Sequence, residues 1–250
     1  MRKSLLNIDQ NPKTIKGQKY GFMTGVLYLA PANLSGRNVC SMAELAACKN
    51  PCLNSAGRGA FSNVQKARIA KTNYYFDDRA GFMANLAADI KLLTKKAAAR
   101  GLVPLVRLNG TSDIKWENVP LTIAGVEYPN IMAAFPDIQF YDYTKIANRD
   151  NVPANYDLTF SYSGVPQYQQ YVKKAIIKGM RIAVVFRTRA AIPKSFLGLD
   201  CVDGDDSDIR HIDAAGVIVA LYAKGKARRD NSGFVVDTPR RVIAIQSAAA

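Results

Sequence analysis

The chain has very little histidine, few cysteines and no long apolar run, and each shortage excludes a class of protein. Its 250 residues include a single histidine, His211, so a zinc site built from two or three histidines is excluded. No stretch reaches the roughly 18 apolar residues of a membrane-spanning helix. The amino terminus turns polar too early for the apolar core of a signal peptide. We therefore expect a soluble, cytoplasmic protein with no membrane partner.

Acidic residues are also scarce. The 20 Asp and Glu residues face 34 Lys and Arg residues, which leaves a formal charge of +14 at pH 7. Such a charge attracts polyanions before any specific contact forms, so nucleic acid or a nucleotide is a candidate partner. The alternative is a solvated basic surface, because the lysines are spread along the chain in small groups such as Lys95-Lys96 and Lys173-Lys174.

The length and the apolar share of 48% predict one domain with a continuous core. We expect an irregular lead-in over residues 1–20 and the folded domain over residues 21–247. The apolar segment 21–31 predicts a first strand, and the three- and four-residue spacing of apolar side chains in 64–99 predicts helices.

Short apolar runs then recur along the rest of the chain. Several lack strict alternation, which is typical of strands buried on both faces, and a helical segment at 168–177 separates two of them. This order favours a single-domain α/β fold: a partial or irregular (β/α) barrel, similar to a TIM barrel, with mostly parallel strands. The segment between Tyr143 and Leu158 shows no helical pattern, which is why the barrel is expected to be irregular. The runs are 103–108, 138–143, 158–162, 182–186, 196–201, 217–222 and 242–245.

Three of the four cysteines follow the first predicted strand in the pattern Cys40-x7-Cys48-x3-Cys52. Without a secretion signal, this cluster indicates a metal site rather than a disulfide framework, and soft thiolates select zinc, copper or iron-sulfur clusters. The alternative is a set of ordinary buried thiols. A fourth ligand from Cys201 or His211 would close the site, whereas its absence would leave a coordination position open.

Polar residues follow several predicted strands, where ligands collect in parallel α/β folds. The turn after residues 103–108 contains both hydrogen-bond donors and a hydrogen-bond acceptor. Arg58 lies beside a glycine-containing turn, where it is placed to bind a carboxylate or phosphate. Four carboxylates between Asp203 and Asp208 lack the spacing of a calcium loop. A later strand leads into a basic turn, whose side chains either bind phosphate or are simply exposed to solvent. The turn after residues 103–108 contains Asn109, Gly110, Thr111, Ser112 and Asp113, and the basic turn contains Lys224, Lys226, Arg228 and Arg229.

The residues that carry these features resemble a known family. The stretch 40–72, the segment Arg107-Leu108-Asn109-Gly110-Thr111-Ser112-Asp113 and the late segment 202–227 are similar to the phage "gene product 88" family. The resemblance covers roughly residues 20–230. It implies a viral protein acting in the cytoplasm of a host bacterium.

A more distant similarity concerns layout. A three-cysteine loop after the first strand, followed by a polar turn after the second, resembles radical S-adenosylmethionine (SAM) enzymes, in which three cysteines hold a [4Fe-4S] cluster whose open iron binds SAM. The resemblance implies that Cys40, Cys48 and Cys52 are cluster ligands and that residues 109–113 form the cofactor turn. The chain departs from that family, because its cysteines are spaced differently and no Gly-Gly-Glu motif follows the second strand.

Two functions remain as alternatives. The first is a [4Fe-4S] enzyme of the radical-SAM type that acts on a nucleotide or nucleic-acid substrate. The second is a non-catalytic iron-sulfur or zinc protein that binds nucleic acid or a host factor.

Overall fold

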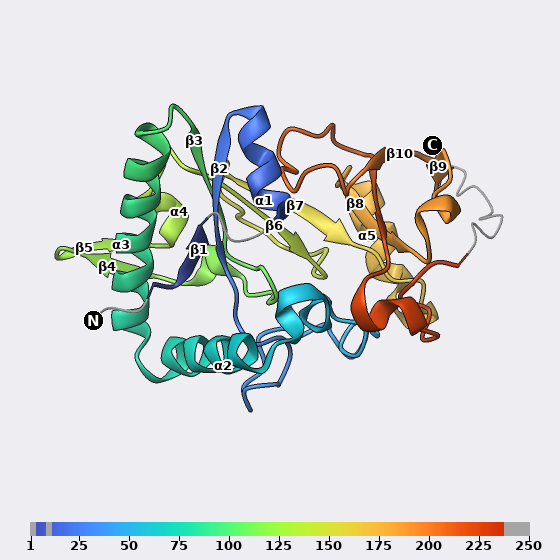
Figure 1. The fold of residues 1–250 in the computed structure, drawn as a ribbon, viewed down its shortest axis with the longest axis horizontal. Coiled ribbons are helices and arrows are strands. Elements are labelled where there is room, and N and C mark those ends of the chain that lie inside the picture. Colours follow the sequence, from blue (N-terminus) through green and yellow to red (C-terminus); the bar gives the residue numbers. More distant parts are fainter. Residues whose placement is uncertain (1–3, 9–11, 238–250) are drawn as a thin grey trace.

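The chain folds around one nine-stranded sheet (Figure 1). The computed structural model describes residues 4–8 and 12–237. The strand order is β1-β2-β3-β6-β7-β8-β11-β10-β9, and a separate hairpin consists of β4 and β5. The strands are β1 (Leu6–Ile8), β2 (Phe22–Leu27), β3 (Val103–Arg107), β4 (Leu121–Ile123), β5 (Val126–Tyr128), β6 (Gln139–Thr144), β7 (Tyr156–Ser161), β8 (Ile182–Phe186), β9 (Ser195–Phe196), β10 (Leu199–Asp203) and β11 (Ile218–Tyr222).

The predicted barrel is wrong, because the sheet is open and mixed. Each inner strand from β2 to β10 pairs in parallel with the next in the sheet, but the two edge strands run antiparallel to their neighbours. Among the described residues, β1 pairs only with β2 and β9 only with β10, so the two edges do not meet. The connection from β6 to β7 contains no helix, as the sequence pattern predicted. A missing helical crossover and short antiparallel edges leave nothing to close a barrel.

Each predicted strand within the described residues is found, and the differences concern the lead-in and the run 196–201. The segment expected as an irregular lead-in contributes β1 to the sheet and contains the short helices α1 (Pro12–Lys16) and η1 (Gly17–Tyr20), where η denotes a 3-10 helix. The run 242–245, expected as a strand, lies outside the described residues. The run 196–201 forms parts of β9 and β10, which turn back on each other.

Two long helices connect β2 to β3, and the second of them packs against β1, β2 and β3 (Figure 1). The predicted helical region 64–99 divides at Asp78 into α2 (Ser62–Asp77) and α3 (Arg79–Ala98), because Asp78 leaves the helical conformation and its carboxylate caps the Gly81 N–H. The inner face of α3 is fully buried in the first core cluster. Its side chains there are Phe82, Leu86, Ile90 and Leu93.

A second core cluster lies under β7, β8 and β11. It packs against α5 (Gln169–Ile177), which connects β7 to β8 as predicted. The remaining helices are short: η2 (Leu53–Ser55), η3 (Gly57–Ala60), η4 (Trp116–Asn118), α4 (Ile131–Ala134), η5 (Pro166–Tyr168), η6 (Arg189–Ala191) and η7 (Gly225–Arg229). The two clusters belong to opposite halves of the same sheet.

Most of the acidic segment that follows β10 is buried, including Asp205 and Asp208. Asp208 accepts a hydrogen bond from Arg107 Nη1 at 2.6 Å, and Ile209 packs against Leu105 and Tyr141. Asp205 pairs with Lys224, and Asp203 with Arg189. Asp206 is exposed and accepts a hydrogen bond from the Tyr20 hydroxyl, so each of the four carboxylates between Asp203 and Asp208 has a partner elsewhere in the chain. We call residues 204–213 the inner segment.

Candidate cysteine site

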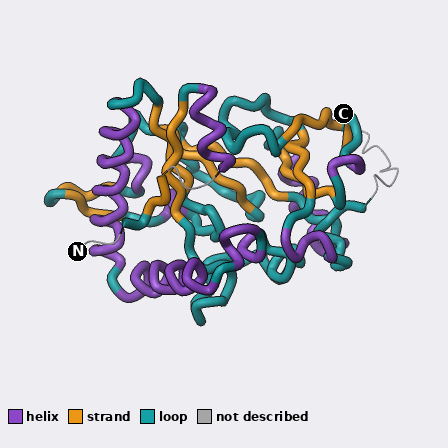
Figure 2. The backbone as a smooth tube through the Cα atoms, in the orientation of Figure 1, coloured by secondary structure: helices purple, strands orange, loops and turns teal. Residues whose placement is uncertain are grey.

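The loop that carries the three cysteines leaves β2 at its carboxyl end. Between β2 and α2 the chain consists of turns and two short helices (Figure 2). Its start is fixed by two buried contacts: the Ala30 N–H donates to Thr72 Oγ1 of α2 at 2.8 Å, and Thr111 Oγ1 donates to the Leu29 carbonyl at 2.6 Å. The loop is thus held between α2 and the turn after β3.

Farther on, the loop reaches the other half of the sheet. Ser163, after β7, donates to the Ala46 carbonyl at 2.8 Å, and the Lys226 N–H donates to Ser55 Oγ at 3.1 Å. Cys40 packs against the first core cluster, whereas Cys48 packs against the second. The cysteine loop therefore lies across the carboxyl ends of strands from both halves.

All three cysteines line one hollow of about 430 Å³, which we call the thiol pocket. Residues from the loop form most of its wall, and Gln65 of α2 and Lys226 of η7 complete it. The lining residues are Pro31, Ala32, Asn33, Leu34, Cys40, Ala43, Cys48, Lys49, Asn50, Cys52, Asn54, Ser55, Ala60, Gln65 and Lys226. The structure thus brings together the three predicted ligands in one pocket.

Burial keeps these thiols protonated. It raises the pKa of Cys40 to about 12 and raises the pKa values of Cys48 and Cys52 as well. Cys48 and Cys52 also raise the pKa of Cys40, and Cys48 raises the pKa of Cys52, so the three thiols interact electrostatically. Their conversion to thiolates therefore requires a positive partner in the pocket, such as a metal or a cationic side chain.

Lys145 supplies a buried cation behind the pocket. Its Nζ donates to the carbonyls of Ser161 and Tyr162, at 3.0 and 2.8 Å, and lies 4.6 Å from the centre of the Phe234 ring. Burial lowers the pKa of Lys145 to about 8. Its positive charge in turn lowers the pKa values of Cys48 and Cys52.

Arg68 of α2 supplies a second cation. Its Nη1 donates to Asn54 Oδ1, and its guanidinium lies 4.7 Å from the centre of the Tyr28 ring. The charge of Arg68 lowers the pKa of Cys52. The sequence did not identify Arg68 as a site residue, because a single arginine within a helical pattern gives no indication that a distant loop packs against it.

The turn 109–113, predicted to bind a cofactor, lies beside Cys40. Cys40 Sγ donates a weak hydrogen bond to the Thr111 carbonyl at 3.8 Å, and the Asp113 N–H donates to the Val39 carbonyl. Gly110 is required here, because a Cβ would come within 2.7 Å of the Leu27 carbonyl oxygen. The turn does not line the thiol pocket.

The polar side chains of this turn bind to the protein itself. Asn109 Oδ1 accepts hydrogen bonds from Ser112 Oγ, the Ile114 N–H and Trp116 Nε1, at 2.8 to 3.0 Å. Asp113 accepts from Thr144 Oγ1 and from the Lys145 N–H, at 2.8 and 2.7 Å. The turn therefore positions Lys145. Arg58, the other predicted cofactor residue, is exposed on η3 outside the pocket wall.

The two candidate fourth ligands lie away from the pocket. Cys201 is opposite Ile218, the first residue of β11, whereas the pocket is reached only beyond the last residue of that strand, about 13 Å farther along. His211 contacts Phe22, the first residue of β2, with ring centres 5.2 Å apart, whereas the cysteine loop follows the last residue. The described part of the chain thus offers no fourth cysteine or histidine to the pocket.

The three thiols are not gathered around one point. In residues 4–8 and 12–237, no three or more His, Cys, Asp or Glu side chains lie in a group that could hold a single metal ion. All three cysteines line the pocket, but they do not form such a group.

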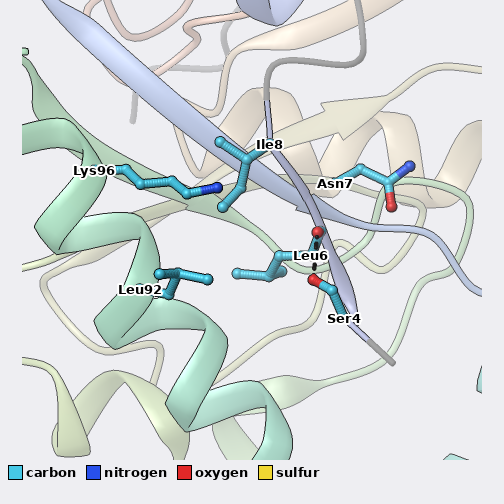
Figure 3. Close-up of a pocket in the computed structure, with 6 residues that line it drawn as sticks. All are labelled: Ser4, Leu6, Asn7, Ile8, Leu92 and Lys96. Carbon is cyan, nitrogen blue, oxygen red and sulfur yellow. Dashed lines mark hydrogen bonds between the residues drawn. The ribbon is translucent and has the colours of Figure 1, made fainter. Parts of the chain in front are cut away.

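A second hollow, of about 300 Å³, lies between β1 and α3 (Figure 3). It contains one charged side chain and no cysteine, and Ser4 Oγ donates to the Leu6 carbonyl across it at 3.1 Å. Its lining residues are Ser4, Leu6, Asn7, Ile8, Leu92 and Lys96. It offers no comparable set of reactive groups.

Fold and site together define an open α/β sheet protein with a cysteine-lined pocket at the carboxyl ends of its parallel strands. A family model described as Gene product 88 matches residues 4–238, so the chain belongs to this family of phage proteins. No curated protein and no solved structure matches the chain. In the described part of the chain, no helix has the length and apolar character needed to cross a membrane.

Proposed function

We propose that the thiol pocket binds a [4Fe-4S] cluster through Cys40, Cys48 and Cys52. The observation that carries the proposal is that three cysteines from a single loop line the same pocket, with the cations Lys145 and Arg68 close enough to lower thiol pKa values. Thiolates are the ligands that iron-sulfur clusters require. The same three residues were singled out by their spacing in the sequence.

The number of ligands favours a cluster over structural zinc. A structural zinc site almost always has four protein ligands, whereas among the described residues neither Cys201 nor His211 reaches the pocket. In radical-SAM enzymes, which the layout of the chain resembles, three cysteines are enough to hold a [4Fe-4S] cluster.

The charges around the pocket suit an anionic cluster. Burial opposes free thiolates, because it raises the pKa values of all three cysteines. Binding of iron replaces the thiol protons, and the charges of Lys145 and Arg68 offset the negative charge that results. Lys226 adds a further cation on the pocket wall.

A second candidate function is SAM-dependent catalysis. It is favoured by the distant positions of Cys201 and His211, which leave the fourth iron without either predicted ligand. When bound, such a cluster would supply a coordination position for SAM and one electron for its cleavage. In this proposal, the turn 109–113 supports the Cys40 side of the cluster.

Anaerobic spectroscopy of the whole chain tests both candidates. The protein purified without oxygen should be brown, and its reduced form should give an electron paramagnetic resonance signal of a [4Fe-4S] cluster. A change in this signal on addition of SAM would support the second candidate, whereas an unchanged signal would reject it. A colourless protein that contains zinc would contradict both.

A further inference from the structure

Four exposed cations lie on η3 and η7, the short helices that contribute Ala60 and Lys226 to the lining of the thiol pocket. They are Arg58 on η3 and Lys226, Arg228 and Arg229 on η7, and we call them the basic rim. None of the four forms an ion pair within the described residues. The acidic side chains nearby are already used: Glu44 pairs with Lys49, and Asp205 pairs with Lys224.

The two parts of the basic rim are held together although they are far apart in the sequence. The short helices η2 and η7 are in contact, and η3 follows η2 directly (Figure 1, where the red η7 lies beside the cyan segment). Gly225 makes this contact possible, because it adopts a φ of +56° and a Cβ there would lie 2.8 Å from the Ser55 carbonyl oxygen. The contact is therefore built into the fold.

Exposed apolar side chains lie among these cations. Phe61, which follows η3, is 58% exposed, and Leu53 of η2 is 56% exposed. Phe61 also precedes α2, whose amino-terminal end has no side-chain cap and no acidic residue in its first turn. An exposed aromatic ring beside uncompensated cations combines a stacking surface with phosphate-binding groups.

We propose that the basic rim and Phe61 bind single-stranded nucleic acid beside the thiol pocket. Unpaired cations attract the phosphates, and Phe61 offers a ring on which an unpaired base can stack. A duplex keeps its bases stacked inside, so it would use the cations but not the ring. The proposal goes beyond cluster binding, because it depends only on surface residues and stands whether or not the pocket contains iron.

Fluorescence anisotropy with a labelled oligo(dT) strand of roughly 20 nucleotides tests the proposal. If all four cations contact phosphate, log affinity should fall with log salt with a slope of about −3, since each contact contributes about −0.7 for single strands. Arg228→Ala combined with Arg229→Ala should reduce the slope to about −1.4. The matched control is Lys91→Ala combined with Lys95→Ala on α3, which removes the same charge from another exposed surface.

The Phe61→Ala variant separates stacking from general charge attraction. It should weaken binding about tenfold at fixed salt, whereas Ile177→Ala, which removes a side chain that is 84% exposed on α5, should not. The proposal would be overturned if the double variants at Lys91 and Lys95 and at Arg228 and Arg229 lost affinity equally, or if a duplex of the same length bound more tightly. Iron content is measured on the same samples, so failure of nucleic-acid binding is distinguishable from failure of cluster binding.

Discussion

Lys145 is a buried cation that lowers the pKa values of two of the three thiols in the pocket, Cys48 and Cys52. It follows β6 directly, and Asp113 holds its backbone N–H while its ammonium group is buried between the Tyr168 and Phe234 rings. In the sequence, Lys145 is only one of several polar residues at the end of a predicted strand. Its burial near two cysteines depends on the packing of a loop that begins more than a hundred residues earlier in the chain. A local sequence pattern cannot predict such a long-range contact.

Lys145 should make the stability of the protein depend on pH. Its pKa falls from 10.5 to about 8 in the folded state, so the unfolded state binds the proton more tightly between these two values. The free energy of unfolding should therefore rise from pH 8 to pH 10.5, by on the order of 3 kcal/mol relative to Lys145→Met, which lacks the charge. Urea denaturation of both proteins at several pH values measures this difference.

The exposed residue Lys91 provides a control for the pH experiment. Lys91→Met removes a lysine from the surface of α3 and should follow the wild type over the whole range. A constant difference between the wild type and Lys145→Met from pH 8 to pH 10.5 would mean that Lys145 is not buried as a charged group.

At the scale of elements, α2 holds the start of the cysteine loop. Thr72 of α2 is fully buried, and its Oγ1 accepts a hydrogen bond from the buried Ala30 N–H. Thr72→Val keeps the shape of the side chain but leaves this N–H without a partner, so it should lower the free energy of unfolding by about 1–3 kcal/mol. Chemical denaturation measures the loss.

Another threonine in a helix supplies the matched control. Thr94 of α3 donates only to the Ile90 carbonyl of its own helix, at 3.0 Å. Thr94→Val should therefore lower the free energy of unfolding clearly less than Thr72→Val does, because it leaves no N–H unpaired. Equal costs for the two variants would show that α2 does not hold the loop through this bond.

The elements that the sequence predicted are those with a strong pattern of their own. The buried strands β3, β6, β8 and β11 and the helix α5 lie in the runs that predicted them. The open edges could not be predicted, because β1 has three residues and β9 has two, too few to show a period. Without the direction of those edge strands, a series of parallel strands is compatible with either a barrel or an open sheet.

At the scale of the whole molecule, the inner segment links parts of the chain that are far apart in the sequence. Asp208 pairs with Arg107 of β3, and both side chains are buried. The sequence shows four carboxylates between Asp203 and Asp208 but no sign of their partners, because each contacts a residue from another part of the chain. The contact between Ser55 and Lys226, which completes the thiol pocket, could not be predicted for the same reason.

Breaking the link between Asp208 and Arg107 should destabilise the whole fold. Asp208→Asn leaves the buried Arg107 without its closest negative partner, so it should lower the free energy of unfolding by about 3 kcal/mol. Asp206→Asn, two residues away, changes an exposed carboxylate and should cost less than about 1 kcal/mol. Urea unfolding curves of the two variants compare them directly, and similar midpoints would contradict the role assigned to the inner segment.

Metal analysis of cysteine variants purified without oxygen tests the central claim most directly. We expect the wild type and Cys201→Ser to contain iron and acid-labile sulfide in equal amounts, as a [4Fe-4S] cluster requires. Cys40→Ser, Cys48→Ser and Cys52→Ser should each lose most of both, while their circular dichroism spectra show that they remain folded. Iron retained in all three variants, or its absence from the folded wild type, would contradict the assignment of the thiol pocket as a cluster site.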